Sequence, residues 1–145
     1  MESFLFLVLA LAPFLAPLVV AATASALAVR AHRREKGGGR RLPDAGSCAL
    51  LAVLAAAIAL GVYGVGVMSG FYILDPEQMC AAAGAPGDYV VTRTTLPVSA
   101  QCVTEKGVGT ELVPDWVNPT VYGGITLGTL ALGAAVFQGR RSTPH

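Results

Sequence analysis

Three long stretches without a charged residue constrain this chain more than any other feature. They cover residues 5–29, 48–74 and 117–138. Each is about as long as the ~20 residues that an α-helix needs to cross a hydrocarbon core ~30 Å thick. Because lipid offers no hydrogen-bonding partners, the backbone polar groups of such a stretch must be satisfied within a helix. The sequence therefore predicts an all-α membrane protein with three transmembrane helices.

The composition disfavours a soluble helical bundle. The chain is 54% apolar and 13% charged, against roughly 25% charged residues in ordinary globular proteins, and the three stretches lack the polar stripe of a surface helix. A cleaved signal peptide is the alternative for the first stretch, with Ala24-Ser25-Ala26 as its cleavage site. Signal peptides begin with basic residues and have a shorter apolar core, whereas this chain begins with Met1-Glu2-Ser3. We therefore expect a retained first helix.

Basic residues next to the apolar stretches predict the orientation. Cytoplasmic loops near membrane helices are enriched in Lys and Arg. Six basic residues follow the first stretch and two follow the third: Arg30, Arg33, Arg34, Lys36, Arg40, Arg41, Arg140 and Arg141. Both groups lie on one side of the membrane only if the N-terminus is outside and the C-terminus inside, which leaves Arg93 and Lys106 on the outer side. The eight residues are the predicted topology anchors.

The predicted organisation has six parts. An outer N-terminus and first transmembrane helix cover 1–29, a basic cytoplasmic loop covers 30–46, and a second transmembrane helix covers 47–71. An extracytoplasmic loop domain follows over 72–117, then a third transmembrane helix over 118–138 and a cytoplasmic tail over 139–145.

The residues near the outer ends of these helices fit this organisation. Tyr72, Trp116 and Tyr122 are predicted to lie at the membrane interface, which such aromatic residues favour. Asn118 is expected to cap the last helix, with Pro119 at the first helical position, where its missing N–H group is not needed.

Catalytic, cofactor, metal and nucleic-acid sites have no support in the sequence. No Asp, Glu, Lys, Arg or His lies inside the three apolar stretches, where such groups mark proton or ion pathways. Gly37-Gly38-Gly39 lacks the spacing of a phosphate-binding loop, and the surrounding basic segment has no aromatic residue to stack on bases. The acidic residues between the second and third helices lack the spacing of a calcium loop and are expected to be solvated: Asp75, Glu77, Asp88, Glu105, Glu111 and Asp115. We therefore expect a protein that is not an enzyme and has no cofactor and no nucleic-acid partner.

Small residues recur at helical spacing in all three stretches. They form Ala12-x-x-x-Ala16, Gly66-x-x-x-Gly70 and Gly124-x-x-x-Gly128. Such pairs let helix backbones approach closely in a membrane. Packing of the three helices within one chain and self-association of several chains both fit this pattern.

Two of the three cysteines lie in the predicted extracytoplasmic loop. Disulfides persist in that compartment, and a bridge between Cys80 and Cys102 would stabilise the loop by roughly 3 kcal/mol in the chain-entropy model. The loop contains no C-x-x-C redox motif. Cys48, near the cytoplasmic end of the second helix, is expected to remain a free thiol.

The same loop has the pattern of a small β-rich domain. Segment 89–95 (YVVTRTT) is rich in β-branched residues and suits a strand. Segments 101–104 and 110–113 flank EKGVG at 105–109, which reads as a glycine-assisted hairpin turn. A sheet this small cannot bury a sufficient core, so the predicted disulfide would be needed to stabilise it.

One part of the chain resembles a group of known proteins. The segments LPVSAQCVT (96–104) and TELVPDWVNP (110–119) are similar to a region of small membrane proteins without an assigned activity from GC-rich bacterial genomes. In those proteins a cysteine, a turn and a Leu-Val-Pro-x-Trp-Val-Asn-Pro run precede the last membrane span. The resemblance covers about a fifth of the chain and implies a bacterial plasma membrane, in which this would be a multi-pass protein.

These features favour a protein that acts by contact with a protein partner through its extracytoplasmic loop. Tyr89, Arg93 and Trp116 are the predicted contact residues, because aromatic and Arg side chains dominate binding energy at interfaces. Two alternatives remain open. One is an oligomeric channel built from the small-residue helix faces, and the other is a membrane thiol oxidoreductase that uses Cys80 and Cys102.

Overall fold

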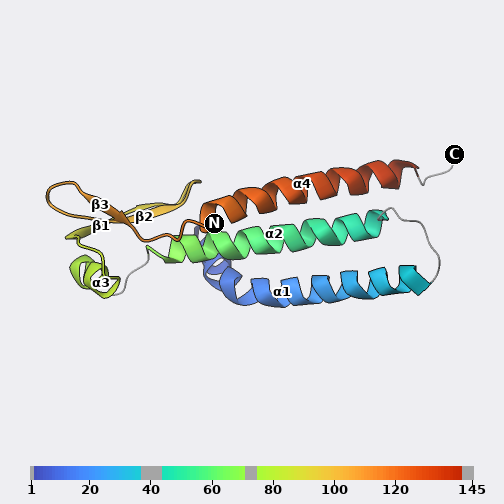
Figure 1. Ribbon diagram of the computed structural model, residues 1–145, viewed down its shortest axis with the longest axis horizontal. Helices are drawn as coiled ribbons and strands as arrows, with labels where there is room; N and C mark the ends of the chain where they lie inside the picture. Colours follow the sequence, from blue (N-terminus) through green and yellow to red (C-terminus); the bar gives the residue numbers. More distant parts are fainter. Residues whose placement is uncertain (1, 37–43, 71–74, 142–145) are drawn as a thin grey trace. The chain divides into compact units, whose positions relative to one another are not determined.

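The computed structural model describes residues 2–36, 44–70 and 75–141. The elements of this part of the chain are α1 (Glu2–Lys36), α2 (Ala45–Met68), α3 (Pro76–Ala82), β1 (Tyr89–Arg93), β2 (Ser99–Val103), β3 (Gly109–Glu111) and α4 (Val117–Arg141), shown in Figure 1. The chain divides into two compact units. We call Met1–Gly61 with Tyr122–His145 the helical unit, and Val62–Val121 the sheet unit.

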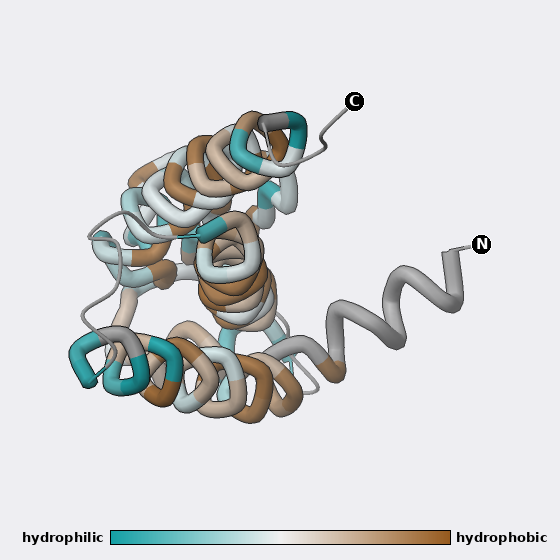
Figure 2. Tube along the Cα trace, turned by 90° about the vertical axis from the view of Figure 1, so that its right-hand side faces the viewer, coloured by the Kyte–Doolittle hydropathy of each residue, from teal (hydrophilic) through white to brown (hydrophobic). Residues whose placement is uncertain are grey.

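The three predicted apolar helices are present. α1, α2 and α4 each contain a segment that is long and apolar enough to cross a membrane: Phe14–Arg33, Ala45–Met68 and Val117–Arg140. Hydrophobic and near-neutral residues dominate these helices in Figure 2. Large apolar side chains such as Leu18 and Leu130 are exposed along them. A surface of this kind is unfavourable in water and suits contact with lipid chains.

α1 continues past residue 30, where the sequence predicted the start of a loop. Arg30, Arg33, Arg34 and Lys36 therefore lie on its last turns. The segment RAHRREK contains good helix formers and neither Gly nor Pro, so nothing in it ends the helix. The other predicted anchors of this region and four further residues named above lie outside the described residues: Arg40, Arg41, Tyr72 and the Gly37-Gly38-Gly39 triplet.

Small residues bring the helices of the helical unit close together. A Cβ atom added to Gly61 of α2 would lie 2.7 Å from Ala16 Cβ of α1, closer than such atoms approach in proteins. One added to Gly124 of α4 would lie 2.8 Å from Ala59 Cβ of α2. Two of the predicted small-residue motifs therefore contribute to packing within one chain.

The sheet unit contains an antiparallel sheet in the order β1-β2-β3. Tyr89 of β1 pairs with Val103 of β2, and Gln101 of β2 pairs with Glu111 of β3. The predicted first strand begins at Tyr89 as expected and ends at Arg93, two residues early. β2 begins at Ser99, two residues before the predicted strand. The short helix α3 was not predicted.

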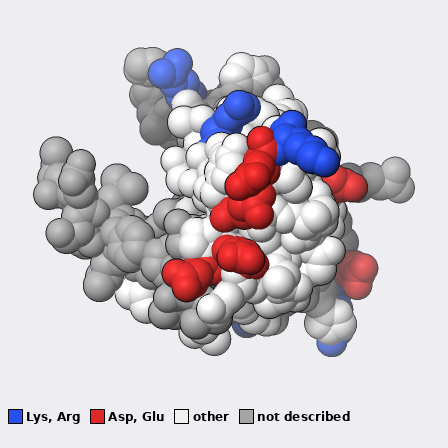
Figure 3. Space-filling model, turned by 90° about the vertical axis from the view of Figure 1, so that its left-hand side faces the viewer, with Lys and Arg blue, Asp and Glu red and all other residues white. Residues whose placement is uncertain are grey.

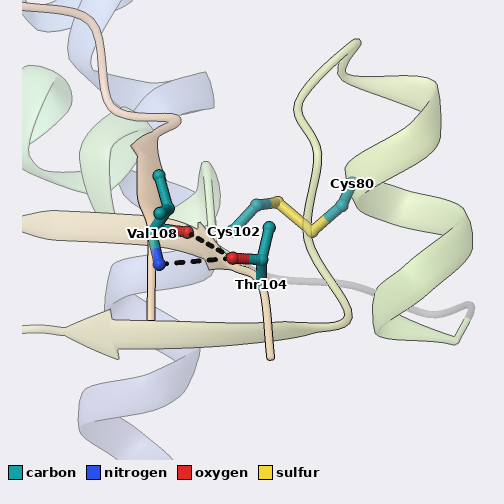
Figure 4. The surroundings of a disulfide bond; sticks show 4 residues. All are labelled: Cys80, Cys102, Thr104 and Val108. Carbon is teal, nitrogen blue, oxygen red and sulfur yellow. Dashed lines mark hydrogen bonds between the residues drawn. A yellow bond between two sulfur atoms is a disulfide. The ribbon is translucent and has the colours of Figure 1, made fainter. Parts of the chain in front are cut away.

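The predicted hairpin turn between β2 and β3 is confirmed. Gly107 has a positive φ of 79°, which only glycine adopts without strain. Thr104 fixes the turn at both ends, because its backbone N–H donates to Val108 O at 3.0 Å and its Oγ1 accepts from Val108 N at 3.2 Å. Figure 4 shows these two residues beside the disulfide.

The inner face of the sheet packs against residues at the end of α2 and the start of α4. Ala100 of β2 is buried together with Val98, Val113 and Val117. From α2, the side chains of Val62, Tyr63 and Val67 pack against this cluster. Burial of these apolar groups stabilises the unit by roughly 25 cal/mol for each Å² removed from water. Three short strands could not supply such a core alone.

Glycines at the end of α2 make this contact close. A Cβ atom added to Gly66 would lie 2.9 Å from Val117 Cγ1, and one added to Gly70 would lie 2.9 Å from Ala100 Cβ. The third small-residue motif, Gly66-x-x-x-Gly70, therefore lets the sheet pack closely against the end of α2 and does not pair two of the long helices.

We expect Gly66→Ala to destabilise the sheet unit, because its new methyl group overpacks a buried contact at a typical cost of about 1–3 kcal/mol. Gly123→Ala is the matched control: Gly123 is also helical, and an added Cβ there meets nothing within 4 Å. The control should be neutral or slightly stabilising, because Ala favours helix over Gly. Thermal unfolding of the two purified variants in detergent would measure the difference, and equal midpoints would contradict this account.

Candidate functional site

The side of the sheet opposite the core is open, and we call it the outer face. Along β1 the side chains of Tyr89, Val91 and Arg93 alternate with those that point inward. Tyr89 is 47% exposed and Val91 is 51% exposed. In the register of the sheet, Arg93 pairs with Ser99 and Val91 pairs with Gln101, so these five side chains share one face.

A groove of about 390 Å³ lies on the outer face. Its walls come from the sheet, from the connection before β2 and from the segment between β3 and α4. The lining residues are Val91, Arg93, Pro97, Val98, Ser99, Gln101, Glu111, Val113, Pro114, Asp115 and Asn118. The groove therefore combines apolar walls with side chains of both charges.

Glu111 is held in this groove by four hydrogen bonds. Its Oε2 accepts from Ser99 Oγ at 2.7 Å and from Gln101 Nε2 at 3.1 Å. Its Oε1 accepts from the backbone N–H groups of Ala100 at 2.8 Å and Val113 at 3.3 Å. Glu111 is exposed, as the sequence predicted, but these bonds also hold its carboxylate in place, which was not predicted. The register pairs Glu111 with Gln101, which brings its side chain to the unpaired donors where β3 ends.

These hydrogen bonds change the acidity of Glu111. Partial burial raises the pKa of its carboxyl group, but the hydrogen bonds from Ser99, Ala100, Gln101 and Val113 lower it by more, so the pKa lies below the ordinary 4.5. Hydrogen bonds of this kind favour the charged form of a carboxyl group. Glu111 is therefore an ionised structural group at neutral pH.

Asn118 also holds the groove together. Its Oδ1 accepts from Val98 N at 2.8 Å, and its Nδ2 donates to Val98 O at 2.9 Å. The predicted role of Asn118 as the helix N-cap is wrong, because α4 already begins at Val117. Its carboxamide instead fixes the connection before β2 against the first turn of α4. A distant backbone partner of this kind cannot be read from local sequence.

Two charged residues that line the groove, Arg93 and Asp115, differ from Glu111 and Asn118 in their interactions. Among the hydrogen bonds and ion pairs of the described residues, none involves the side chain of Arg93 or Asp115. Both residues are exposed. They provide one positive and one negative group at the border of the same cavity.

The predicted contact residues divide between two places. Tyr89 and Arg93 lie on the outer face, as the alternation along β1 requires. Trp116 is 54% exposed and precedes α4, but it does not line the groove. Val91, between Tyr89 and Arg93, was missed by the sequence analysis, although the same alternation identifies it.

The predicted disulfide joins Cys80 of α3 to Cys102 of β2. The two Cα atoms are 5.8 Å apart, and both residues are 0% exposed. Figure 4 shows the bridge between the short helix and the sheet. Cys48 is buried and free, as predicted. The bridge fixes α3 against the inner face, opposite the groove.

Carboxylates outnumber cations in the sheet unit. Residues 62–121 contain six acidic side chains and two basic ones, a formal charge of −4. Figure 3 shows acidic side chains gathered in a band beside basic ones over one surface. Within the described residues, no group of three His, Cys, Asp or Glu side chains is arranged to hold a metal ion.

Comparison with protein-family models, with curated proteins and with solved structures finds no match to this chain.

We expect Glu111→Gln to destabilise the end of the sheet by about 1 kcal/mol, because the neutral amide loses charge-assisted hydrogen bonds in a partly solvated setting. The folded-state pKa of Glu111 is depressed. Its stabilisation is therefore complete above the unfolded value and is lost as the pH falls through the folded-state pKa.

Hydrogen exchange at the Ala100 and Val113 amides would measure both effects. Protection should fall in the wild type as the pH drops below the ordinary carboxyl pKa of 4.5, after correction for intrinsic rates, and should be lower and less pH-dependent in Glu111→Gln. Glu105→Gln, at the exposed hairpin turn, is the control and should behave as wild type. The same pH dependence in both variants would rule out this role for Glu111.

Proposed function

We propose that this chain is a three-span protein of a bacterial plasma membrane. It acts by contact with a protein partner through the outer face of its extracytoplasmic sheet unit, and it is not an enzyme. The observation that carries this proposal is the exposed strip formed by Tyr89, Val91 and Arg93 on a sheet whose other face is fixed by packing and a disulfide.

The charge distribution supports the orientation. Three spans place the end of α1, the start of α2 and the end of α4 on one side of the membrane. Eight of the ten basic residues lie in the segments 30–41 and 140–141 on that side. An excess of Lys and Arg is the pattern of cytoplasmic segments. The sheet unit then lies outside, where its disulfide persists.

The geometry of the outer face supports contact more than catalysis. The polar groups of Ser99, Gln101 and Glu111 are bound to one another and to the backbone, so none is presented as a nucleophile or base. Residues 62–121 contain no histidine. Tyr89 and Arg93 beside the apolar Val91 instead have the composition typical of residues that dominate binding energy.

The two alternatives have less support. Thiol exchange requires access to a sulfur atom, and Cys80 and Cys102 are both 0% exposed. A channel built on the small-residue faces would need them free for other copies. Gly61 and Gly124 face helices of the same chain, and Gly66 contacts the core of the sheet unit.

Cysteine labelling tests the orientation. In a Cys48→Ser background we place a single new cysteine at Gly38 or at the exposed Val108 of the hairpin turn. An impermeant maleimide applied to intact cells should label Val108→Cys at once and Gly38→Cys only after the membrane is broken. Labelling of Gly38→Cys in intact cells would refute the proposed orientation.

Photo-crosslinking tests the contact surface. A benzoylphenylalanine residue in place of Tyr89 should give one defined adduct in native membranes, and one in place of the exposed Gln78 on α3 should not. Val91→Asp should reduce the Tyr89 adduct at least tenfold, which corresponds to about 1.4 kcal/mol of binding free energy, whereas Gln78→Asp should leave it unchanged. Equal adducts from both positions, or none from Tyr89, would argue against a partner at the outer face.

A further inference from the structure

The groove on the outer face presents two opposite charges that the protein does not pair with each other. Arg93 and Asp115 both line it, yet within the described residues no ion pair joins them. A cavity of about 390 Å³ falls in the size range of small-ligand sites, ~300–1,000 Å³. A ligand that carries both an anionic and a cationic group would complement these two charges.

The polar side chains of Glu111 and Asn118 in the groove already have hydrogen-bond partners within the protein. Glu111 is saturated by donors from Ser99, Ala100, Gln101 and Val113. Asn118 is occupied on both sides by Val98. A ligand would therefore find a fixed surface on which Arg93 and Asp115 are the free charged groups, so little ordering of the site is required on binding.

The groove lies at the level where a membrane helix begins. Asn118 in its wall belongs to the first turn of α4, at the start of the candidate span Val117–Arg140. Trp116, next to Asp115 in the chain, is exposed, and tryptophan favours the membrane–water interface. With α4 in a membrane, the groove borders the layer of lipid headgroups.

We propose that this groove binds the zwitterionic headgroup of a phosphoethanolamine lipid, with its phosphate at Arg93 and its primary ammonium at Asp115. The ethylene link between the two groups would contact Val91 and Pro97. This inference rests on the membrane placement of α4 in the proposed function, but not on the existence of a protein partner.

Headgroup chemistry makes the proposal selective. Arg recognises phosphate through several N–H donors in a planar fork. A primary ammonium donates three hydrogen bonds to a carboxylate, whereas the quaternary ammonium of phosphocholine donates none. Phosphoglycerol carries no cation for Asp115. Phosphoethanolamine is therefore the headgroup that satisfies both groups.

Trp116 provides the measurement, because it is the only tryptophan of the chain and lies beside Asp115. The full-length protein in detergent is titrated with short-chain lipids that have identical acyl chains and phosphoethanolamine, phosphocholine or phosphoglycerol headgroups. We expect a saturable change in Trp116 fluorescence with phosphoethanolamine and at least tenfold weaker binding of the other two. Soluble O-phosphoethanolamine, titrated separately, distinguishes a free zwitterion from a lipid.

Four variants test the assignment. Arg93→Gln and Asp115→Asn should each weaken phosphoethanolamine binding at least tenfold without changing the thermal midpoint. Lys106→Gln and Glu77→Gln are exposed charge-neutralising controls and should bind as wild type. Equal binding of the three headgroups, or unchanged binding in Arg93→Gln and Asp115→Asn, would overturn the proposal. Equally tight binding of soluble O-phosphoethanolamine would overturn the lipid as the source.

These results are separable from those that test the proposed function. Asp115→Asn should weaken the lipid response at least tenfold and leave the crosslink from position 89 intact, because Tyr89 does not line the groove. Absence of the crosslink alone would refute the proposed protein partner. Absence of the lipid response alone would refute the proposed headgroup site.

Discussion

The sheet of this protein has a core only because two long helices supply it. Val62, Tyr63 and Val67 of α2 pack with Val117 of α4 against Val98 and Ala100 of the sheet. Gly66 and Gly70 permit this approach, since a single methyl group at either position would meet buried atoms at 2.9 Å or less. The position of the outer face and of its groove depends on this contact. The disulfide adds α3 to the same inner side, and the opposite side is left open.

The sequence predicted the features that leave a clear pattern in a short stretch of residues. Three uncharged stretches predicted three helices, two cysteines in one loop predicted a bridge, and the glycines of 105–109 predicted a hairpin turn. α1 extends beyond its predicted end at residue 29, because the Arg and Lys residues that follow favour helix as well as loop. α3 has only seven residues, too few for a clear period. The orientation of the helices in a membrane remains a prediction.

Residue type alone predicts Tyr89 and Arg93 as part of the candidate site, because aromatic and Arg side chains dominate binding energy at interfaces. Tyr89 and Arg93 share a face because β1 has a period of two. The groove itself depends on tertiary contacts between segments far apart in sequence. Glu111 reaches Ser99 and Ala100 of β2, and Asn118 reaches Val98 twenty residues away. The sequence predicted a solvated Glu111 and a helix-capping Asn118, because no neighbouring residue in the chain indicates these distant hydrogen-bond partners.

The order of these segments along the chain has a consequence for biogenesis. Val98 and Ala100 are synthesised before Val117, yet Val117 is fully buried against them. The core of the sheet unit therefore cannot close until the start of α4 has left the ribosome. Before that moment the sheet lacks one wall, and Asn118 is not yet present to hold the connection at Val98. Maturation of this unit is therefore tied to delivery of the last helix.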